Sequence, residues 1–175
     1  MLIGARNFGL IGGAAERGIG FRFLNNSGIG YSGLITGGNT PTFANLVDGN
    51  LTNWVGDSSG ADNNSITVVL YGISPAVRFN LLRVYINSAF PSGGVSAGRW
   101  NQVAVEGSND TTNGTNGTWT NIGWDDGTTL KDLSVPQDQW VNYPFNNVAP
   151  YAAYRFRQTN IEQYISIHEI ELIAR

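Results

Sequence analysis

The sequence contains no cysteine, a single histidine (His168) and a single lysine (Lys131) in 175 residues. Without cysteine there is no disulfide framework and no thiolate that could act as a nucleophile or metal ligand. Zinc sites built on cysteine are therefore excluded, and the single His168 excludes those that need several histidines. Any metal site in this chain must draw mainly on oxygen donors.

Charge is also scarce, since Asp, Glu, Lys and Arg make up 13% of the chain, with a net charge of −3. This share is about half the usual one. Nucleic-acid binding needs clustered Lys and Arg to neutralise phosphates, and no basic run is present, so we expect no nucleic-acid partner. Asn, Thr, Ser and Gly then dominate the surface. Such neutral hydrogen-bonding surfaces are well matched to sugars, and they are also common in virion and extracellular proteins.

Long apolar runs are missing as well. No stretch of about 18 apolar residues occurs, so we expect no membrane span. The start of the chain, residues 1–8, lacks a basic region followed by a long apolar core, and we see no signal peptide there. An extracellular or virion location, which we expect, would then require assembly, cell lysis or earlier removal of a signal.

Glycine and aromatic residues are plentiful, with 23 Gly, 8 Phe, 7 Tyr and 5 Trp. Short segments of alternating or β-branched apolar residues recur between turn signals. They are residues 65–71, 81–86, 102–106, 118–122, 140–143, 154–157 and 165–173. Seven or eight short strands with this spacing predict an all-β domain, a jelly-roll β-sandwich of about eight antiparallel strands.

The chain divides into a Gly-rich N-terminal segment, residues 1–40, and a β-sandwich domain, residues 41–175. Two interpretations of residues 1–40 remain open: the segment forms strand, for example at residues 18–24, or it is an arm that a partner orders. Residues 28–33 fit the spacing G-x-G-x-x-G, but the following Gly-Gly-Asn-Thr-Pro would stop the helix that a dinucleotide site requires. We interpret these glycines as turns in a β region.

The last predicted strand contains an irregularity. Ile165 and Ile167 place the apolar side chains at odd positions, whereas Ile170 and Leu172 place them at even positions. Strict alternation cannot do this, because a slip of one residue moves every side chain to the other face. We therefore predict a bulge near His168 and Glu169, with Glu169 re-aimed.

Oxygen donors are concentrated in a short turn. Asp48, Asn50 and either Thr52 or Asn53 lie within six residues, as a hard cation such as calcium requires. Glu169 or Glu171 could complete such a site from the far end of the chain. The alternative is that Asp-Gly-Asn is only a tight turn.

Four segments together resemble one known family. The run Ala44–Trp54 resembles the opening of galactose-binding-like (discoidin, or coagulation-factor C-type) β-sandwich domains, whose pattern is A-x-D-G-N-x-x-T-x-W. Three later segments match in order and extend the resemblance over residues 40–175. They are residues 105–110 with Trp119 further on, residues 151–157 and residues 167–174.

The resemblance implies an eight-stranded jelly roll with a structural calcium ion. By the resemblance, the side chains of Asp48, Asn50 and Glu169 bind Ca²⁺, together with backbone carbonyls near Asn45 and His168. The chain departs from the pattern because one residue is missing before Trp54. Either Thr52 or Asn53 then supplies a further ligand, or neither does.

The resemblance also implies that loops at one end of the sandwich bind galactose-type sugars, other glycans or phospholipid. The loops in this chain are residues 54–64, 87–101, 123–130 and 160–164. Sugar sites combine an aromatic platform with fixed polar groups and a planar guanidinium. The residues predicted to supply them are Phe90, Arg99, Trp100, Trp124 and Tyr164. Phospholipid is disfavoured, because the loops lack a basic rim.

Other residues of the same types are predicted to be structural. We expect Trp54 and Trp119 to plug the core or its rim, and Arg155 and Arg157, on one face of a strand, to have a structural role. The single His168 has no Ser or Asp at a recognisable catalytic spacing. Asp125 and Asp126 are neighbours, whereas glycoside hydrolysis needs two separated carboxylates. We therefore expect no enzyme.

Two functions remain. The first is a non-catalytic, lectin-like carbohydrate-binding domain with a structural calcium site, whose partner is a glycan or a cell-surface polysaccharide. The alternative is a virion structural protein built on the same sandwich, a phage capsid-decoration or tail and adhesion component. It would dock other virion proteins through residues 1–40, and oligomerisation remains open for either function.

Overall fold

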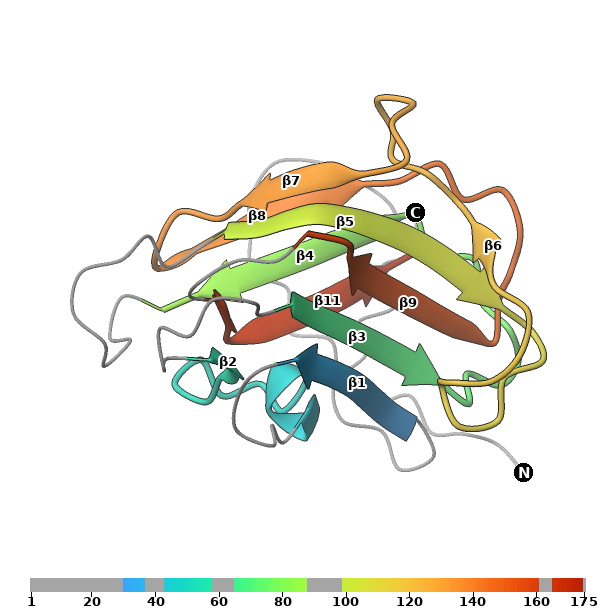
Figure 1. The fold of residues 1–175 in the computed structure, drawn as a ribbon, viewed down its shortest axis with the longest axis horizontal. Coiled ribbons are helices and arrows are strands. Elements are labelled where there is room, and N and C mark those ends of the chain that lie inside the picture. The colour runs from blue at the N-terminus through green and yellow to red at the C-terminus, as the bar shows by residue number, and fades with distance from the viewer. Residues whose placement is uncertain (1–29, 37–42, 58–64, 88–98, 161–164, 175) are drawn as a thin grey trace.

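The computed structural model describes residues 30–36, 43–57, 65–87, 99–160 and 165–174 (Figure 1). These ranges contain eleven β-strands and one short 3-10 helix. The elements are β1 (Gly30–Thr36), η1 (Phe43–Leu46), β2 (Val55–Asp57), β3 (Ser65–Tyr71), β4 (Leu81–Ile86), β5 (Arg99–Ser108), β6 (Thr120–Asn121), β7 (Lys131–Ser134), β8 (Gln139–Pro144), β9 (Ala153–Gln158), β10 (Ile165–Ile167) and β11 (Glu169–Ile173). No helix in this part of the chain is long and apolar enough to cross a membrane.

The strands form two main antiparallel sheets. The larger sheet has the order β1-β3-β9-β5-β6, and β7 also pairs with β5. The smaller sheet has the order β11-β4-β8, and β10 and β2 form a separate pair. Every strand pair is antiparallel, so the prediction of an all-β antiparallel sandwich is confirmed.

The core lies between the two sheets because the apolar side chains alternate with polar ones along the strands. Tyr154 and Phe156 of β9 face inward from the larger sheet, and Leu82 and Val84 of β4 face inward from the smaller one. The side chains that face outward are Arg155 and Arg157 on β9 and Arg83 on β4, and each is partly exposed. Burying an apolar side chain such as Phe156 contributes about 1.5–3 kcal/mol, so this alternation stabilises the sandwich.

Strands with alternating or β-branched apolar residues were predicted accurately, whereas β1, β2 and β7 were missed. Residues 65–71 and 81–86 form β3 and β4 as predicted. A strand was predicted at residues 118–122, but only the two residues of β6 form a strand there. Gly30 and Gly33, interpreted as turn residues, lie within β1, which pairs along its whole length with β3. The possible strand at residues 18–24 lies outside the described residues.

The predicted irregularity in the last strand is confirmed, and it is larger than a bulge. The strand breaks at His168, so that β10 pairs with β2 while β11 pairs with β4. His168 N donates to Tyr85 O at 3.1 Å at the break. Ile167 and Ile170 are both buried as a result, and Glu169, which is also buried, contacts the turn that contains Gly49.

Several strands start or finish at the same end of the sandwich, which we call the loop end. There β2 ends at Asp57, which pairs with the first residue of β10, and β4 ends at Ile86. In Figure 1, β4 ends and β5 begins on the same side of the molecule, at the left of the view. The turn between β7 and β8 lies at the same end, because Asp138 N donates to Ile86 O at 2.7 Å.

Candidate functional site

The predicted metal turn, residues 48–53, folds on its own side chains. Asp48 Oδ1 accepts a hydrogen bond from Asn50 N at 2.7 Å, and Asp48 Oδ2 accepts one from Asn53 Nδ2 at 2.6 Å. Asn50 Oδ1 accepts from both Thr52 N and Thr52 Oγ1, at 3.1 and 2.7 Å. Gly49 has a φ of 76°, which favours glycine at the centre of the turn. Both alternatives for the further ligand, Thr52 and Asn53, therefore contact a predicted ligand.

Glu169 reaches this turn from 120 residues further along the chain. Its Oε1 accepts a hydrogen bond from Gly49 N at 3.2 Å, although Glu169 itself is fully buried at 0% exposure. A carboxylate with no access to water needs compensating polar groups or a cation. The structure thus brings Glu169 to the Asp48 turn, as the resemblance implied.

Asn45 and His168, the two predicted backbone ligands, flank this contact. Asn45 belongs to η1, and its Nδ2 lies 3.5 Å from Trp54 O. His168 Nδ1 accepts a hydrogen bond from Asn87 N at 3.2 Å, so the histidine ring is held at the end of β4. Burial lowers the pKa of His168 to about 4, and the charge of Asp138 acts in the opposite direction.

The donors gathered here fit calcium in kind, because they are carboxylate, amide and backbone oxygens. Within the described ranges, no three His, Cys, Asp or Glu side chains gather at one place. A cation at this turn would therefore combine Asp48 and Glu169 with neutral oxygens such as that of Asn50. A soft metal, which needs thiolate or several imidazoles, does not fit.

Of the predicted ligand-binding residues, Phe90 and Tyr164 lie outside the described residues. Arg99 is the first residue of β5 and therefore lies at the loop end, in the region where the resemblance placed the ligand. It pairs with Ser134, directly before the turn between β7 and β8.

Trp100 and Trp124 were predicted to form part of the aromatic platform, and this is wrong for both. Each is 0% exposed. Trp100 Nε1 donates to Ile66 O at 3.1 Å, and Trp124 Nε1 donates to Val103 O at 2.7 Å. Both rings fill the space between the sheets, so neither ring face is accessible to a sugar.

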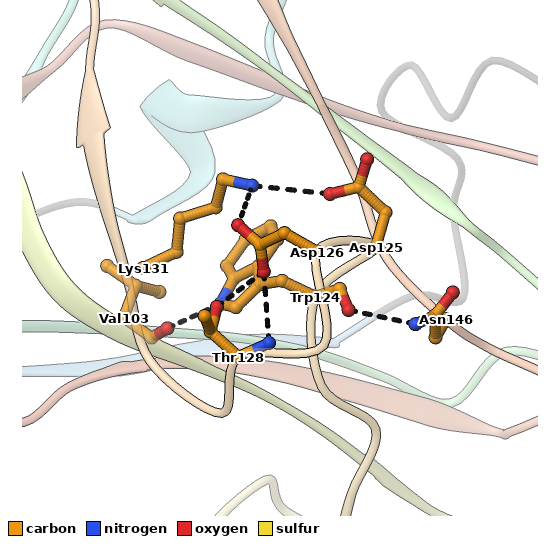
Figure 2. Close-up of polar contacts among 7 residues, drawn as sticks. All are labelled: Val103, Trp124, Asp125, Asp126, Thr128, Lys131 and Asn146. Carbon is orange, nitrogen blue, oxygen red and sulfur yellow. Dashed lines mark hydrogen bonds and ion pairs between the residues drawn. The ribbon is translucent and has the colours of Figure 1, made fainter.

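The turn that follows Trp124, one of the four predicted ligand loops, is a compact structure anchored to the sandwich (Figure 2). Lys131 Nζ binds Asp125 at 3.2 Å and Asp126 at 2.6 Å. Asn146 Nδ2 donates to Trp124 O at 2.9 Å. Lys131 pairs with Val103 in the middle of β5, so this turn lies away from the loop end.

The same ion pairs argue against a catalytic role for the two aspartates. Hydrogen bonds from Lys131 and Thr128 hold the pKa of Asp126 far below its usual range. A general acid must carry a proton near neutral pH, so Asp126 is unsuited to that task. Both carboxylates also bind one ammonium group, which does not give the separated pair that glycoside hydrolysis needs.

The sequence alone did not identify Trp140 as a candidate. Trp140 is partly exposed on β8 and pairs with Tyr85 near the loop end, with ring centroids 5.4 Å apart. The Arg83 guanidinium lies 4.7 Å from the centroid of the Trp140 ring. The available signal was the alternation of Arg83 and Tyr85 on the outer face of β4, but the partner strand could not be known.

Comparison with known proteins found no matching family model and no matching curated protein sequence. Solved structures do match. A family 32 carbohydrate-binding module from Clostridium perfringens, in complex with GalNAc-β-1,3-galactose, is 12% identical with a TM-score of 0.56, over 84% of this chain and 96% of that one. The module of C. perfringens NanJ, in complex with galactose, is 11% identical with a TM-score of 0.56, over 82% and 93%.

A third match is the family 32 module of AlyQ in complex with 4,5-unsaturated mannuronic acid, 12% identical with a TM-score of 0.56, over 82% of this chain and 95% of that one. The three matched structures are all β-sandwich modules of one fold class. The chain therefore has the galactose-binding-like β-sandwich fold, and the resemblance seen in its sequence is confirmed at the level of the fold.

Proposed function

We propose that this chain is a non-catalytic carbohydrate-binding domain with a structural calcium site. The observation that supports it best is the fold, which matches modules captured with galactose, with a GalNAc-containing disaccharide and with an unsaturated uronic acid. The low charge and the amide- and hydroxyl-rich composition agree with this function, since they suit neutral hydrogen bonding to sugars.

The sugar would bind at the loop end. Arg99 begins β5 there, and in the sequence Phe90 lies between β4 and β5 and Tyr164 between β9 and β10. Trp140, which contacts Arg83 and Tyr85, adds an aromatic ring on β8. An aromatic ring covers the apolar face of a sugar, and a planar guanidinium binds its hydroxyl groups, so together they provide the chemistry that a sugar site requires.

A glycan array with the purified chain tests this proposal, followed by calorimetric titration of the best sugar. We expect Arg99→Ala and Tyr164→Ala to abolish binding, and Trp140→Ala to weaken it by about tenfold, which corresponds to about 1.4 kcal/mol of lost contact with the sugar. Val148→Ala is the matched control, because Val148 is 88% exposed in the turn between β8 and β9, at the other end of β8. Absence of binding to every sugar would refute the proposal.

Calcium would be held by the side chains of Asp48, Asn50 and Glu169, with Thr52 or Asn53 and backbone carbonyls near Asn45 and His168. Such an ion would neutralise the carboxylate of Glu169, which is buried, and would fix the turn against the start of β11. The role of the calcium ion would be structural, because the aromatic residues proposed to bind the sugar do not belong to this turn.

A second function, that of a virion structural protein, is favoured by one observation. β1 lies within the Gly-rich residues 1–40 and pairs along the edge of the larger sheet. Strand addition at a sheet edge is a common way for one chain to dock on another. If residues 1–29 mediate assembly, their deletion should abolish oligomers seen by size-exclusion chromatography and leave glycan binding unchanged. Loss of glycan binding with intact oligomers would instead argue for a sugar-binding role of the arm.

A further inference from the structure

The outer face of the larger sheet carries a cluster of charged and aromatic side chains. Glu106 on β5, Arg155 and Arg157 on β9, and Trp119 directly before β6 form this cluster, which we call the arginine face. Strand register brings the members together, since Glu106 pairs with Arg155 on one side and with Asn121 of β6 on the other.

Two guanidinium groups share a single carboxylate in the arginine face. Arg155 Nε donates to Glu106 Oε2 at 2.6 Å. Arg157 Nε and Nη2 donate to Glu106 Oε2 and Oε1 at 3.3 and 3.1 Å. Burial acts to raise the pKa of Glu106, but Arg157 and Arg155 together lower the pKa below its usual value. Glu106 is therefore ionised at neutral pH, and the cluster carries a local excess of one positive charge in a chain whose net charge is −3.

Among the three charged side chains of the cluster, Arg157 is the most exposed. Its side chain is 42% exposed, against 19% for Arg155 and 9% for Glu106. Across the strands Arg157 pairs with Ala104 and Thr67, whose side chains are small. No described residue accepts a hydrogen bond from Arg157 Nη1, so the edge of the guanidinium with Nη1 is available to a ligand.

Trp119 supplies an aromatic ring beside this charge. The Arg155 guanidinium lies 4.2 Å from the centroid of the Trp119 ring, and Trp119 Nε1 donates to Asn116 O at 3.2 Å. These contacts fix the ring, while Trp119 remains partly exposed. The exposed Thr120 and Asn121 of β6 follow it directly and add a hydroxyl and an amide.

We propose that the arginine face is a second glycan-binding surface, selective for sugars that carry a carboxylate, such as chains of uronic acids. This proposal rests on the proposed function, and it concerns a different surface. A guanidinium binds a carboxylate with two parallel charge-assisted hydrogen bonds, and Arg157 presents its outer edge for this. Trp119 packs on the apolar face of a neighbouring sugar ring, and Thr120 and Asn121 bind its hydroxyl groups. The local positive charge attracts a polyanion that the rest of the chain repels.

The test is calorimetric titration with tetragalacturonate and, as a matched ligand, its fully methyl-esterified form, at one fixed calcium concentration. The two ligands differ in charge and hardly in shape. The chain should bind the acid at least about tenfold more tightly than the ester, since charge-assisted hydrogen bonds are worth roughly 1.5–3 kcal/mol. Added salt should weaken binding of the acid and leave binding of the ester unchanged.

Four variants locate the binding. Arg157→Gln should weaken binding of the acid about tenfold or more, and Arg157→Lys should restore only part of it, because an ammonium lacks the planar fork. Glu106→Gln should strengthen binding, since it removes the carboxylate that competes for both guanidinium groups. Arg78→Gln removes the same charge from an exposed residue outside the cluster and should have no effect. Thermal melting of each variant verifies that it is folded.

Each of the remaining outcomes would refute the arginine face as a binding surface, and one of them would also refute the proposed carbohydrate-binding function. Equal binding of acid and ester, or binding of neutral glycans alone, would refute the arginine face and leave the proposed carbohydrate-binding function intact. Binding of the acid that Arg99→Ala abolishes and Arg157→Gln leaves unchanged would assign the acid to the loop end, against this proposal. Binding of no sugar at all would refute the proposed function and this inference together.

Discussion

Tyr154 shows at the scale of one residue how the core satisfies its polar groups. Its ring is 0% exposed, and its hydroxyl lies at the meeting point of three segments. Tyr154 Oη donates to Val77 O at 2.6 Å and accepts from Phe79 N at 3.1 Å and from Asn147 Nδ2 at 2.7 Å. Burial raises the pKa of Tyr154 to about 12, so the hydroxyl keeps its proton in the physiological range. One oxygen thus connects the two turns that flank β4 and β9.

We expect Tyr154→Phe to lower the free energy of unfolding by about 2–3 kcal/mol, because a buried polar group that loses its partner costs about 1–3 kcal/mol. Denaturant unfolding measures this. Tyr143→Phe is the comparison: its hydroxyl makes one hydrogen bond, to Ser134 O at 2.6 Å, and Ser134 is exposed so that water can replace it. The loss there should stay below about 1 kcal/mol. Equal losses for the two variants would contradict this account of Tyr154.

His168 predicts a pH dependence of stability. Its folded pKa is about 4 because the ring is buried, whereas the unfolded value is about 6.5. Between these values the unfolded chain takes up a proton that the folded chain does not, so stability falls as the pH falls from about 6.5 to about 4. The loss from this group should reach about 3 kcal/mol.

The measurement is urea unfolding from pH 7 to pH 4, with a chelator present so that no metal contributes. His168→Gln cannot take up the proton, and its amide oxygen can still accept the hydrogen bond from Asn87 N. The variant should therefore lose less stability over this range than the parent chain. Parallel curves would show that His168 is not the group responsible.

At the scale of the strand, two register shifts decide what sequence patterns could predict. The shift at His168 was visible, because apolar residues lie on both sides of it and change from odd to even positions. The shift in β5 was not. Between Trp100 and Val103 the pairing with β7 is irregular, and Gln102 has a φ of 51°. Without this irregularity, strict alternation counted back from Val103 would place the Trp100 side chain on the outer face of the sheet.

This second shift explains why Trp100 was wrongly predicted to belong to the aromatic platform. Trp100 was predicted to face a ligand near the end of the loop at residues 87–101, but the irregular residues before Val103 turn its ring into the core. Local periodicity determines which residues of one strand share a face, and it determined β3, β4 and β9 well. It does not determine which strands are neighbours, so the pairs Trp140 with Tyr85 and Trp119 with Arg155 could not be predicted.

The edge strand β1 supplies a prediction at this scale. β1 pairs with all seven residues of β3, whose sequence Ser-Ile-Thr-Val-Val-Leu-Tyr is strongly β-forming and apolar. An uncovered strand of this kind is a template for association. A chain that starts at residue 37 should therefore melt at a lower temperature and self-associate, as light scattering would detect. A chain that starts at residue 30 keeps β1 and should remain monodisperse if the full chain is. Identical behaviour of the two would show that β1 does not protect this edge.

At the scale of the whole molecule, the contact between the Asp48 turn and Glu169 joins two parts of the chain that are 120 residues apart. The turn precedes the first strand of the β2–β10 pair, and Glu169 begins β11 of the smaller sheet. A cation between them would hold both the β2 segment and the last strand in place. Single domains usually melt as one cooperative unit, so ion binding at this point should stabilise the entire domain.

Calcium at about 100 times its dissociation constant should add about 2.7 kcal/mol to the free energy of unfolding. For a domain of this size, this corresponds to a rise in melting temperature of roughly 5–10 °C, which a chelator should reverse. Glu169→Gln should abolish the difference between calcium and chelator. Glu171→Gln is the matched control, because Glu171 lies two residues further along β11 and pairs with Arg83 at 2.8 Å instead of facing the turn. That variant should have a lower melting temperature in both conditions and the same response to calcium, since its carboxylate is not a ligand. A calcium response that survives in Glu169→Gln, or is absent from the parent chain, would show that the Asp-Gly-Asn sequence is only a tight turn.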